Sequence, residues 1–297
     1  MFRKAVFVIR ENILQEKILS EDSILVDSLR EHGIMVVCMT WDRQDLEWMR
    51  GAELYEDGSV DAKQTMYITD SEKLYQELRR QGKYVLPYRH ERNQDAGFKG
   101  APYVVEKAEE LDYESVDMAY RRLAGLPWEI LTTKRCIIRE TIEEDVDSFY
   151  RIYEDPEITR YMENLYADRD EEIAYVKEYR QKVYAFYGYG MWTVLTREGT
   201  VIGRAGVTWR EGFDIPEMGF VIGVPWQRQG YAWEICSAIL DYAREELGFT
   251  QIQALVMNGN KKSAALCEKM GFECAGSAWL EEGEYILYRK EIGLAGN

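Results

Sequence analysis

The apolar positions of residues 1–128 follow two alternating spacings. Short apolar runs predict strands at 4–9, 34–40, 65–69 and 83–88. Apolar residues at helical spacing predict helices at 22–32, 72–81 and 115–124. The run at 34–40 is so continuously apolar that we expect a strand buried on both faces. Strands that alternate with helices predict parallel βαβ units in an open, Rossmann-like sheet.

The residues after 130 show a different order of elements. A strand is predicted at 134–139, and helices follow at 142–153 and 171–184. Three strands separated by glycine-containing turns come next, at 190–197, 201–209 and 217–224. The remaining elements are a helix, a strand, a helix and two strands, at 233–247, 251–257, 261–270, 272–278 and 285–289. This order favours a mixed, mainly antiparallel sheet with helices on both faces, so we predict two α/β domains, 1–128 and 131–297.

Composition and charge narrow the classes of protein. The formal net charge is −16, which argues against a nucleic-acid partner because phosphates require a basic surface. Five cysteines without CxxC pairing indicate reduced thiols in a cytoplasmic protein. No apolar run is long enough to span a membrane, and the N-terminus does not resemble a signal peptide. The two histidines have no partner pattern, so we expect no metal site.

One short stretch carries chemistry. Gln227-Arg-Gln-Gly-Tyr-Ala232 lies between an apolar strand and an amphipathic helix. Its glycine permits a close backbone turn, and the helix start directs unpaired N–H groups and positive dipole toward a ligand. Arg228 adds a cation, so the stretch suits a phosphate or pyrophosphate. Taken alone, it is equally typical of an ordinary strand-to-helix connection.

Three segments together resemble the GNAT superfamily of acyl-CoA-dependent N-acyltransferases. QRQGYA matches the family's pyrophosphate loop, Q/R-x-x-G-x-G/A. The segment from Asn260 to Phe272 resembles the second motif, an asparagine followed by a helix that ends in Gly-Phe, and residues 133–145 resemble the opening strand and helix. The resemblance covers roughly residues 131–292, and its details look most like the branch with the ribosomal-protein N-terminal acetyltransferases. It implies direct acetyl transfer from acetyl-CoA, in a ternary complex and without a metal, to a small-molecule amine or a peptide N-terminus.

The resemblance also implies the residues of the site. The backbone amides that would hold the pyrophosphate are those of Arg228, Gln229, Gly230, Tyr231 and Ala232. In the family the fourth strand diverges from the fifth, so the backbone expected to pair with the pantetheine arm belongs to Ile222, Gly223 and Val224. Asn260 would bond the same arm, but asparagine is also a preferred helix N-cap, and both roles are compatible.

Two residues are candidates for the chemical steps. Glu217 begins the strand where several GNAT enzymes carry a general base, although a carboxylate at a strand end is often only solvated. Cys267 occupies the position, seven residues after the asparagine, where the family often has a tyrosine acid. A thiol is able to donate a proton, but small buried cysteines are common in helices. Because of this departure, we keep open a non-catalytic acyl-CoA-binding or interaction protein.

The N-terminal half resembles a second family more diffusely. Residues 29–40 are similar to the second motif of haloacid dehalogenase-like hydrolases, where a threonine ends a strand, and Ile68-Thr-Asp-Ser71 is similar to their acidic fourth motif. The first strand lacks the nucleophilic D-x-D, and without that carboxylate nothing accepts the phosphoryl group. We therefore predict a degenerate domain without hydrolase activity, which opposes the further alternative of a phosphatase; a generic Rossmann-like sheet fits the pattern almost as well.

Overall fold

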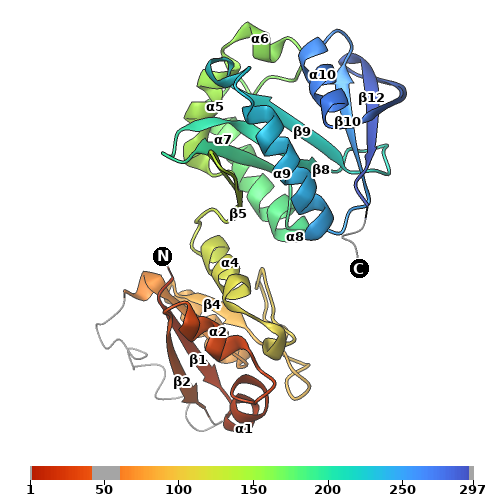
Figure 1. Cartoon of the computed structure of the whole chain (residues 1–297). Coiled ribbons are helices and arrows are strands. Elements are labelled where there is room, and N and C mark those ends of the chain that lie inside the picture. The colour runs from red at the N-terminus through yellow and green to blue at the C-terminus, as the bar shows by residue number, and fades with distance from the viewer. Residues whose placement is uncertain (1, 42–60, 294–297) are drawn as a thin grey trace. The chain divides into compact units, whose positions relative to one another are not determined.

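The computed structural model of the chain describes residues 2–41 and 61–293. The chain divides into two compact units, Met1–Trp128 and Glu129–Asn297 (Figure 1). Each unit has its own sheet, one of four strands and one of eight. The predicted fold class is confirmed: one α/β unit has a parallel sheet, and the other has a mixed, mainly antiparallel one.

The sheet of the first unit is entirely parallel, in the order β2-β1-β3-β4. Its strands are β1 Lys4–Ile9, β2 Met35–Thr40, β3 Thr65–Thr69 and β4 Tyr84–Pro87. The principal helices are α2 Leu25–Glu31, α3 Glu72–Arg80 and α4 Tyr113–Leu123. A short helical segment over Glu11–Ile18 (α1 and the π-helical turn η1) was not predicted, because it spans too few turns for its period to be recognised.

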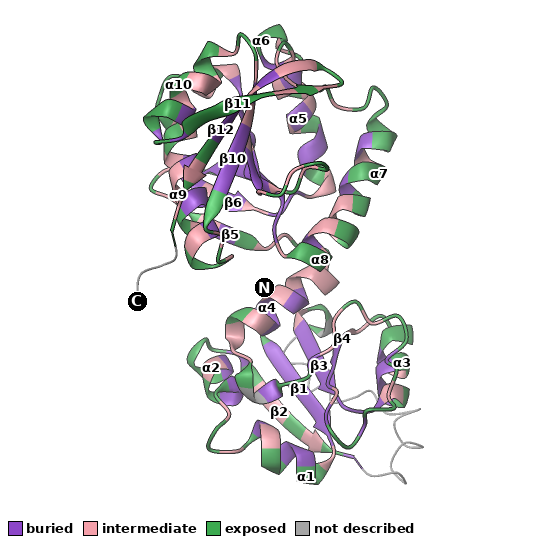
Figure 2. Cartoon of the chain, turned by 90° about the vertical axis from the view of Figure 1, so that its right-hand side faces the viewer, coloured by how far each residue is buried: buried purple, intermediate pink, exposed green. Residues whose placement is uncertain are grey.

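The prediction that the strand at 34–40 is buried on both faces is wrong. β1 and β3 are buried along their whole length, whereas β2 alternates between exposed and half-buried positions (Figure 2). Met35, at the start of β2, is 40% exposed. The reason is position: within the described sheet β2 is an edge strand, and an apolar run does not reveal which strand lies at the edge.

The second unit is built on a sheet in the order β11-β12-β10-β9-β8-β7-β6-β5. The strands are β5 Glu129–Thr132, β6 Cys136–Arg139, β7 Met191–Thr196, β8 Val201–Thr208, β9 Glu217–Ile222, β10 Gln251–Met257, β11 Glu273–Leu280 and β12 Gly283–Glu291. The helices are α5 Val146–Tyr153, α6 Pro156–Thr159, α7 Arg169–Tyr179, α8 Ala185–Tyr187, α9 Tyr231–Glu245 and α10 Lys261–Lys269, with a π-helical turn at Arg180–Tyr184. The four-residue strand β5, which pairs with β6, was not predicted.

Helices cover both faces of this sheet. Trp192 on β7 stacks edge-on against Tyr242 of α9, with ring centroids 5.7 Å apart. Trp192 pairs with Ala205 on the neighbouring strand β8, and Arg204 is the residue before Ala205. The guanidinium of Arg204 lies 4.8 Å from the centre of the Phe149 ring on α5. Because successive side chains of a strand point to opposite faces, α5 and α9 pack on opposite faces.

The strands β9 and β10 diverge along their length. They are parallel neighbours, but a single pair, Glu217 with Gln253, is in register. β9 remains paired to β8 along its full length, and β10 to β12. The sheet is therefore open between β9 and β10 beyond Glu217, and this opening positions the candidate site.

Candidate active site

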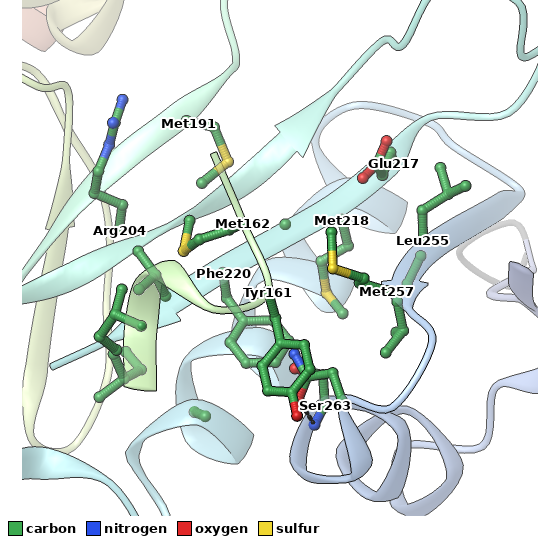
Figure 3. A pocket seen from close by; sticks show the side chains of 18 of the residues that line it. Tyr161, Met162, Met191, Arg204, Glu217, Met218, Phe220, Leu255, Met257 and Ser263 are labelled. Carbon is green, nitrogen blue, oxygen red and sulfur yellow. Dashed lines mark hydrogen bonds between the residues drawn. The ribbon is translucent and has the colours of Figure 1, made fainter. Parts of the chain in front are cut away.

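A cavity of about 1810 Å³ occupies this opening and the face beneath α6 and α7. Figure 3 shows side chains from β9 and β10, including Phe220 and Met257, directed into it. Of the residues predicted for the site, the cavity is lined by Glu217, Ile222, Arg228, Gly230, Ala232, Asn260 and Cys267. Gly223, Val224, Gln229 and Tyr231 belong to the adjoining turn but do not line the cavity.

The QRQGYA turn presents free amides at one end of the cavity. Arg228 and Gly230 both have positive φ, 60° and 82°. α9 begins at Tyr231 without a side-chain cap, and no group in the described part of the chain accepts a backbone hydrogen bond from residues 228–230. Unpaired N–H groups at the positive end of a helix dipole, beside the exposed Arg228, have the chemistry that binds an anion, and we refer to this turn as the predicted anion site.

Arg135, in the turn between β5 and β6, contacts this turn directly. Its guanidinium donates to Glu234 at 2.6 Å and to the Gln229 carbonyl at 3.0 Å, and it lies 4.0 Å from the centre of the Tyr231 ring. Glu234 also accepts from the N–H of Arg135 at 2.9 Å. The anion site is therefore fixed by a residue almost a hundred positions earlier in the chain, which no local motif indicated.

The free edge of β9 is narrower than predicted. Gly223 donates its N–H to Ile202 on β8 at 2.9 Å, and its carbonyl accepts from Trp226 at 2.8 Å. Gly223 therefore has no N–H left for a pantetheine arm, and its carbonyl already has one partner. By the alternation of an antiparallel ladder, Ile222 turns its N–H and C=O away from β8, toward the opening, but its carbonyl accepts from the Gln227 side chain at 2.9 Å. Ile222 keeps its N–H available, so the predicted pairing rests on Ile222 and Val224.

Asn260 is the N-cap of α10. Its side-chain oxygen accepts from the N–H of Ser263 at 3.2 Å, as a capping asparagine does. The residue also lines the cavity. The capping role is observed, and a bond from its amide nitrogen to a cofactor stays a prediction.

Glu217 lies where β9 and β10 begin to separate. Its side chain is 10% exposed, and Arg210 donates to it through Nε at 2.5 Å and Nη2 at 3.4 Å. Gln253, the register partner of Glu217, is fully buried, and neither end of its amide has a partner among the described residues. Neither Arg210 nor Gln253 was predicted, because Arg210 reaches Glu217 from the turn before β9 and Gln253 reaches it through the register of β9 and β10.

Cys267 is a poor acid in its surroundings. The residue is fully buried in α10 and lines the cavity. Burial raises the pKa of its thiol to about 11, because a thiolate is poorly solvated there. Cys267 thus stays a thiol at neutral pH and releases its proton less readily than an exposed cysteine.

Two further carboxyl groups meet beside Glu217. Glu163, in the segment between α6 and α7, is hydrogen-bonded to Glu282 in the turn between β11 and β12, and this bond raises the pKa of Glu163. The same bond lowers the pKa of Glu282.

No cluster of three or more histidine, cysteine or acidic residues suited to a metal occurs in residues 2–41 and 61–293. Over the same residues, no helix combines the length and apolar character that crossing a membrane requires.

Comparison with known proteins identifies the family. Residues 135–273 match the family model described as "Acetyltransferase (GNAT) domain". The chain is 30% identical over 140 residues to the protein YkkB of Bacillus subtilis, covering 45% of this chain and 80% of YkkB. It is 28% identical to the N-acetyltransferase YoaA of the same organism, covering 50% and 84% of the two chains. It is 26% identical to the "[Ribosomal protein uS5]-alanine N-acetyltransferase" of Escherichia coli, covering 52% and 84%. The chain belongs to the GNAT acetyltransferases, and it is an N-acetyltransferase.

The matched family model lies within the second unit. The haloacid dehalogenase-like reading of the first unit therefore stays a prediction.

Proposed function

We propose that the second unit transfers the acetyl group of acetyl-CoA directly to a primary amine, with both substrates bound at once. The observation that carries this proposal is the opening between β9 and β10, which leads from the anion-binding turn at Gly230 to the carboxylate of Glu217. An extended, amide-bearing cofactor arm fits such a gap as an added strand would.

The binding step rests on the turn and the edge of β9. The N–H groups of residues 228–232, with Arg228, would hold the pyrophosphate. Lys262 adds a second cation near the turn: its Nζ lies 2.6 Å from Glu157 and 3.3 Å from Gln227. The N–H of Ile222 would bond the pantetheine arm, which directs the thioester toward Glu217.

The reaction needs a base for the amine more than it needs an acid for the leaving thiolate. An alkyl ammonium with a pKa of about 10 is mostly protonated at neutral pH and must lose a proton before it attacks. Glu217, held in place by Arg210, is the carboxylate placed to accept that proton. The leaving thiolate is less basic, with a thiol pKa of about 8.5, so it departs without a strong acid. We therefore give Cys267 a minor role.

For the acceptor, we propose a peptide N-terminus or a small-molecule amine. The similarity to an enzyme named for alanine acetylation on a ribosomal protein supports the peptide. All five cysteines are free, which supports our proposal of a reducing, cytoplasmic setting.

For the first unit, we propose a degenerate domain without hydrolase activity. Arg10 follows β1, where a hydrolase of the resembled family would need its acidic nucleophile. Asp70 after β3 is 1% exposed and accepts hydrogen bonds from Trp41 at 2.6 Å and His90 at 3.0 Å. A carboxylate occupied in this way serves the packing of the unit.

A thiol-release screen with acetyl-CoA tests the proposal. The panel contains polyamines, amino acids, aminoglycosides and peptides with a free N-terminus. We expect thiol release that depends on one class of amine. Acetyl-CoA binding without release for any amine would instead support a non-catalytic acyl-CoA-binding protein.

A further inference from the structure

The cavity has a second lobe beneath α7. It is lined by residues of α5, α7, the π-helical turn and β8: Tyr153, Glu172, Tyr175, Tyr179, Val183 and Arg204. In Figure 3, Arg204 and Glu217 stand at opposite ends of the view, with Met162 and Met191 between them. The lobe therefore continues the acceptor side of the site away from the opening between β9 and β10.

Arg204 has no counter-ion among the residues that the structure describes. It takes part in no ion pair there, and its Nε is buried without a hydrogen-bond partner. Its guanidinium lies 4.8 Å from the ring of Phe149. The guanidinium is hydrogen-bonded to the Tyr153 hydroxyl, which is a neutral partner. A guanidinium is always charged, and a buried charge without a counter-ion is unfavourable.

The tyrosines around Arg204 do not supply the missing negative charge. Burial raises the pKa of Tyr179 to about 12 and also raises that of Tyr153, Tyr175 and Tyr184, so all four stay neutral. Tyr179 accepts from the N–H of Met191 at 2.9 Å, and Tyr184 accepts from the N–H of Thr141 at 3.2 Å. These two hydroxyls are therefore committed to the backbone.

The carboxylate in the same lobe, that of Glu172, is bonded to the backbone and not to Arg204. Glu172 is 2% exposed and accepts from the N–H of Tyr166 at 3.1 Å. Arg204 is therefore a cation on a cavity wall that is mainly aromatic, and it makes no ion pair with the carboxylate of Glu172 in the described structure. Arginine matches a carboxylate through parallel hydrogen bonds, so a carboxylate is the ligand that this lobe fits.

We propose that Arg204 binds a carboxylate of the acceptor and thereby selects peptides with an acidic residue close to the N-terminus. This inference rests on the proposed acetyl transfer. Arg204 pairs with Val221 on β9, four positions from Glu217, and four strand residues span ~13 Å. A free amino acid is too short for this distance, whereas a chain of two or three residues spans ~7–10 Å and its side chain supplies the rest.

The test compares two peptides that differ in one group. Both have a free N-terminus and an amidated C-terminus; one carries glutamate at position 3 and the other glutamine. We expect kcat/KM for the glutamate peptide to be ~10–100-fold higher than for the glutamine peptide. This is the fold-change that corresponds to the free energy of one hydrogen bond between charged groups. In Arg204→Met this ratio falls to about one, and Arg204→Lys retains part of it.

Arg151→Met is the matched control, because Arg151 is an exposed arginine of α5 outside the cavity lining. It should keep the parent ratio. Equal rates for the two peptides with the parent protein would overturn the inference, as would a ratio that persists in Arg204→Met. If Arg204→Met is unfolded by thermal melting, the parent ratio and Arg204→Lys still decide.

The outcome is separable from that of acetyl transfer. Transfer to both peptides at equal rates removes the role of Arg204 and leaves the transferase intact. If no amine is acetylated, calorimetry of the two peptides with the protein loaded with CoA makes the same comparison by affinity, and equal affinities would exclude the carboxylate site.

Discussion

At the scale of single residues, Glu217 shows that a motif can indicate a residue without indicating the residues that contact it. The family resemblance pointed to Glu217, but the guanidinium that fixes it comes from the turn before β9, and Gln253 comes from β10. Arg204 and Glu163 reach the same cavity from two other segments, and Glu282 is hydrogen-bonded to Glu163. None of these three lies in one of the motifs, so the motifs indicated the cofactor side of the site and the proposed base but not the rest of the acceptor side.

Glu217→Gln removes the proposed base and keeps its shape. We expect the turnover number to fall by ~10²–10⁴-fold, the usual worth of a positioned base. Acetyl-CoA affinity should change little, and raising the pH should restore part of the rate as more amine becomes neutral. The measurement is the rate from pH 6 to 10 with a known acceptor. Glu211→Gln, at an exposed turn position outside the cavity, is the control; parent-like turnover in Glu217→Gln would place the base elsewhere.

Cys267→Ala should be the milder change. With a pKa of about 11, Cys267 stays protonated from pH 6 to 10, so loss of its proton should produce no alkaline fall in the parent rate. We expect a loss of roughly tenfold or less, caused by a small cavity in α10. The pH profile of both proteins checks this. If Cys267→Ala is folded but more damaged than Glu217→Gln, the two roles are reversed.

At the scale of elements, periodicity predicted the order of the helices and strands along the chain but not the position of each strand within its sheet. β1, β3 and β10 begin and end at the predicted residues. β2 was placed in the interior although it lies at an edge, and β5 was missed because four residues show too little alternation. Burial depends on which strands become neighbours, and that is decided by contacts far apart in the sequence.

The turn before α9 is the element on which cofactor binding depends. In Gly230→Val the added side chain would occupy space beside the free amides, and its Cβ would lie 3.5 Å from the Arg135 guanidinium. We expect acetyl-CoA affinity to fall ~10–100-fold or more, measured by calorimetry. Gly199→Val has a matched backbone, with φ of 89° against 82° and open space around the Cβ, but lies in the turn between β7 and β8. It should bind as the parent does; equal affinities in two folded variants would refute the assignment of the turn.

At the scale of the whole molecule, the two units pose separable questions. The acyltransferase motifs lie after Trp128, and among the residues that the structure describes the cavity is lined by the second unit alone. We propose that residues 129–297 hold the complete cofactor site. Expressed alone and soluble, they should bind acetyl-CoA with the affinity of the full chain. A loss of more than about tenfold in a folded fragment would mean that the first unit supports the site.

The first unit should release no phosphate from a generic phosphomonoester. It lacks an acidic nucleophile after β1, and its buried Asp70 is hydrogen-bonded to Trp41 and His90. Phosphate release by the full chain that Asp70→Asn abolishes would contradict this expectation.

The most direct test of the account measures both products of one reaction. Acetyl-CoA and an acceptor amine found by the screen are incubated with the protein, and free thiol and acetylated amine are quantified together. The account predicts equal amounts of the two products, a rate that depends on the amine, a strong loss in Gly230→Val and parent-like activity in Gly199→Val. Thiol release without acetylated amine, or acetyl-CoA binding with no product for any amine, would contradict acetyl transfer in the opening between β9 and β10.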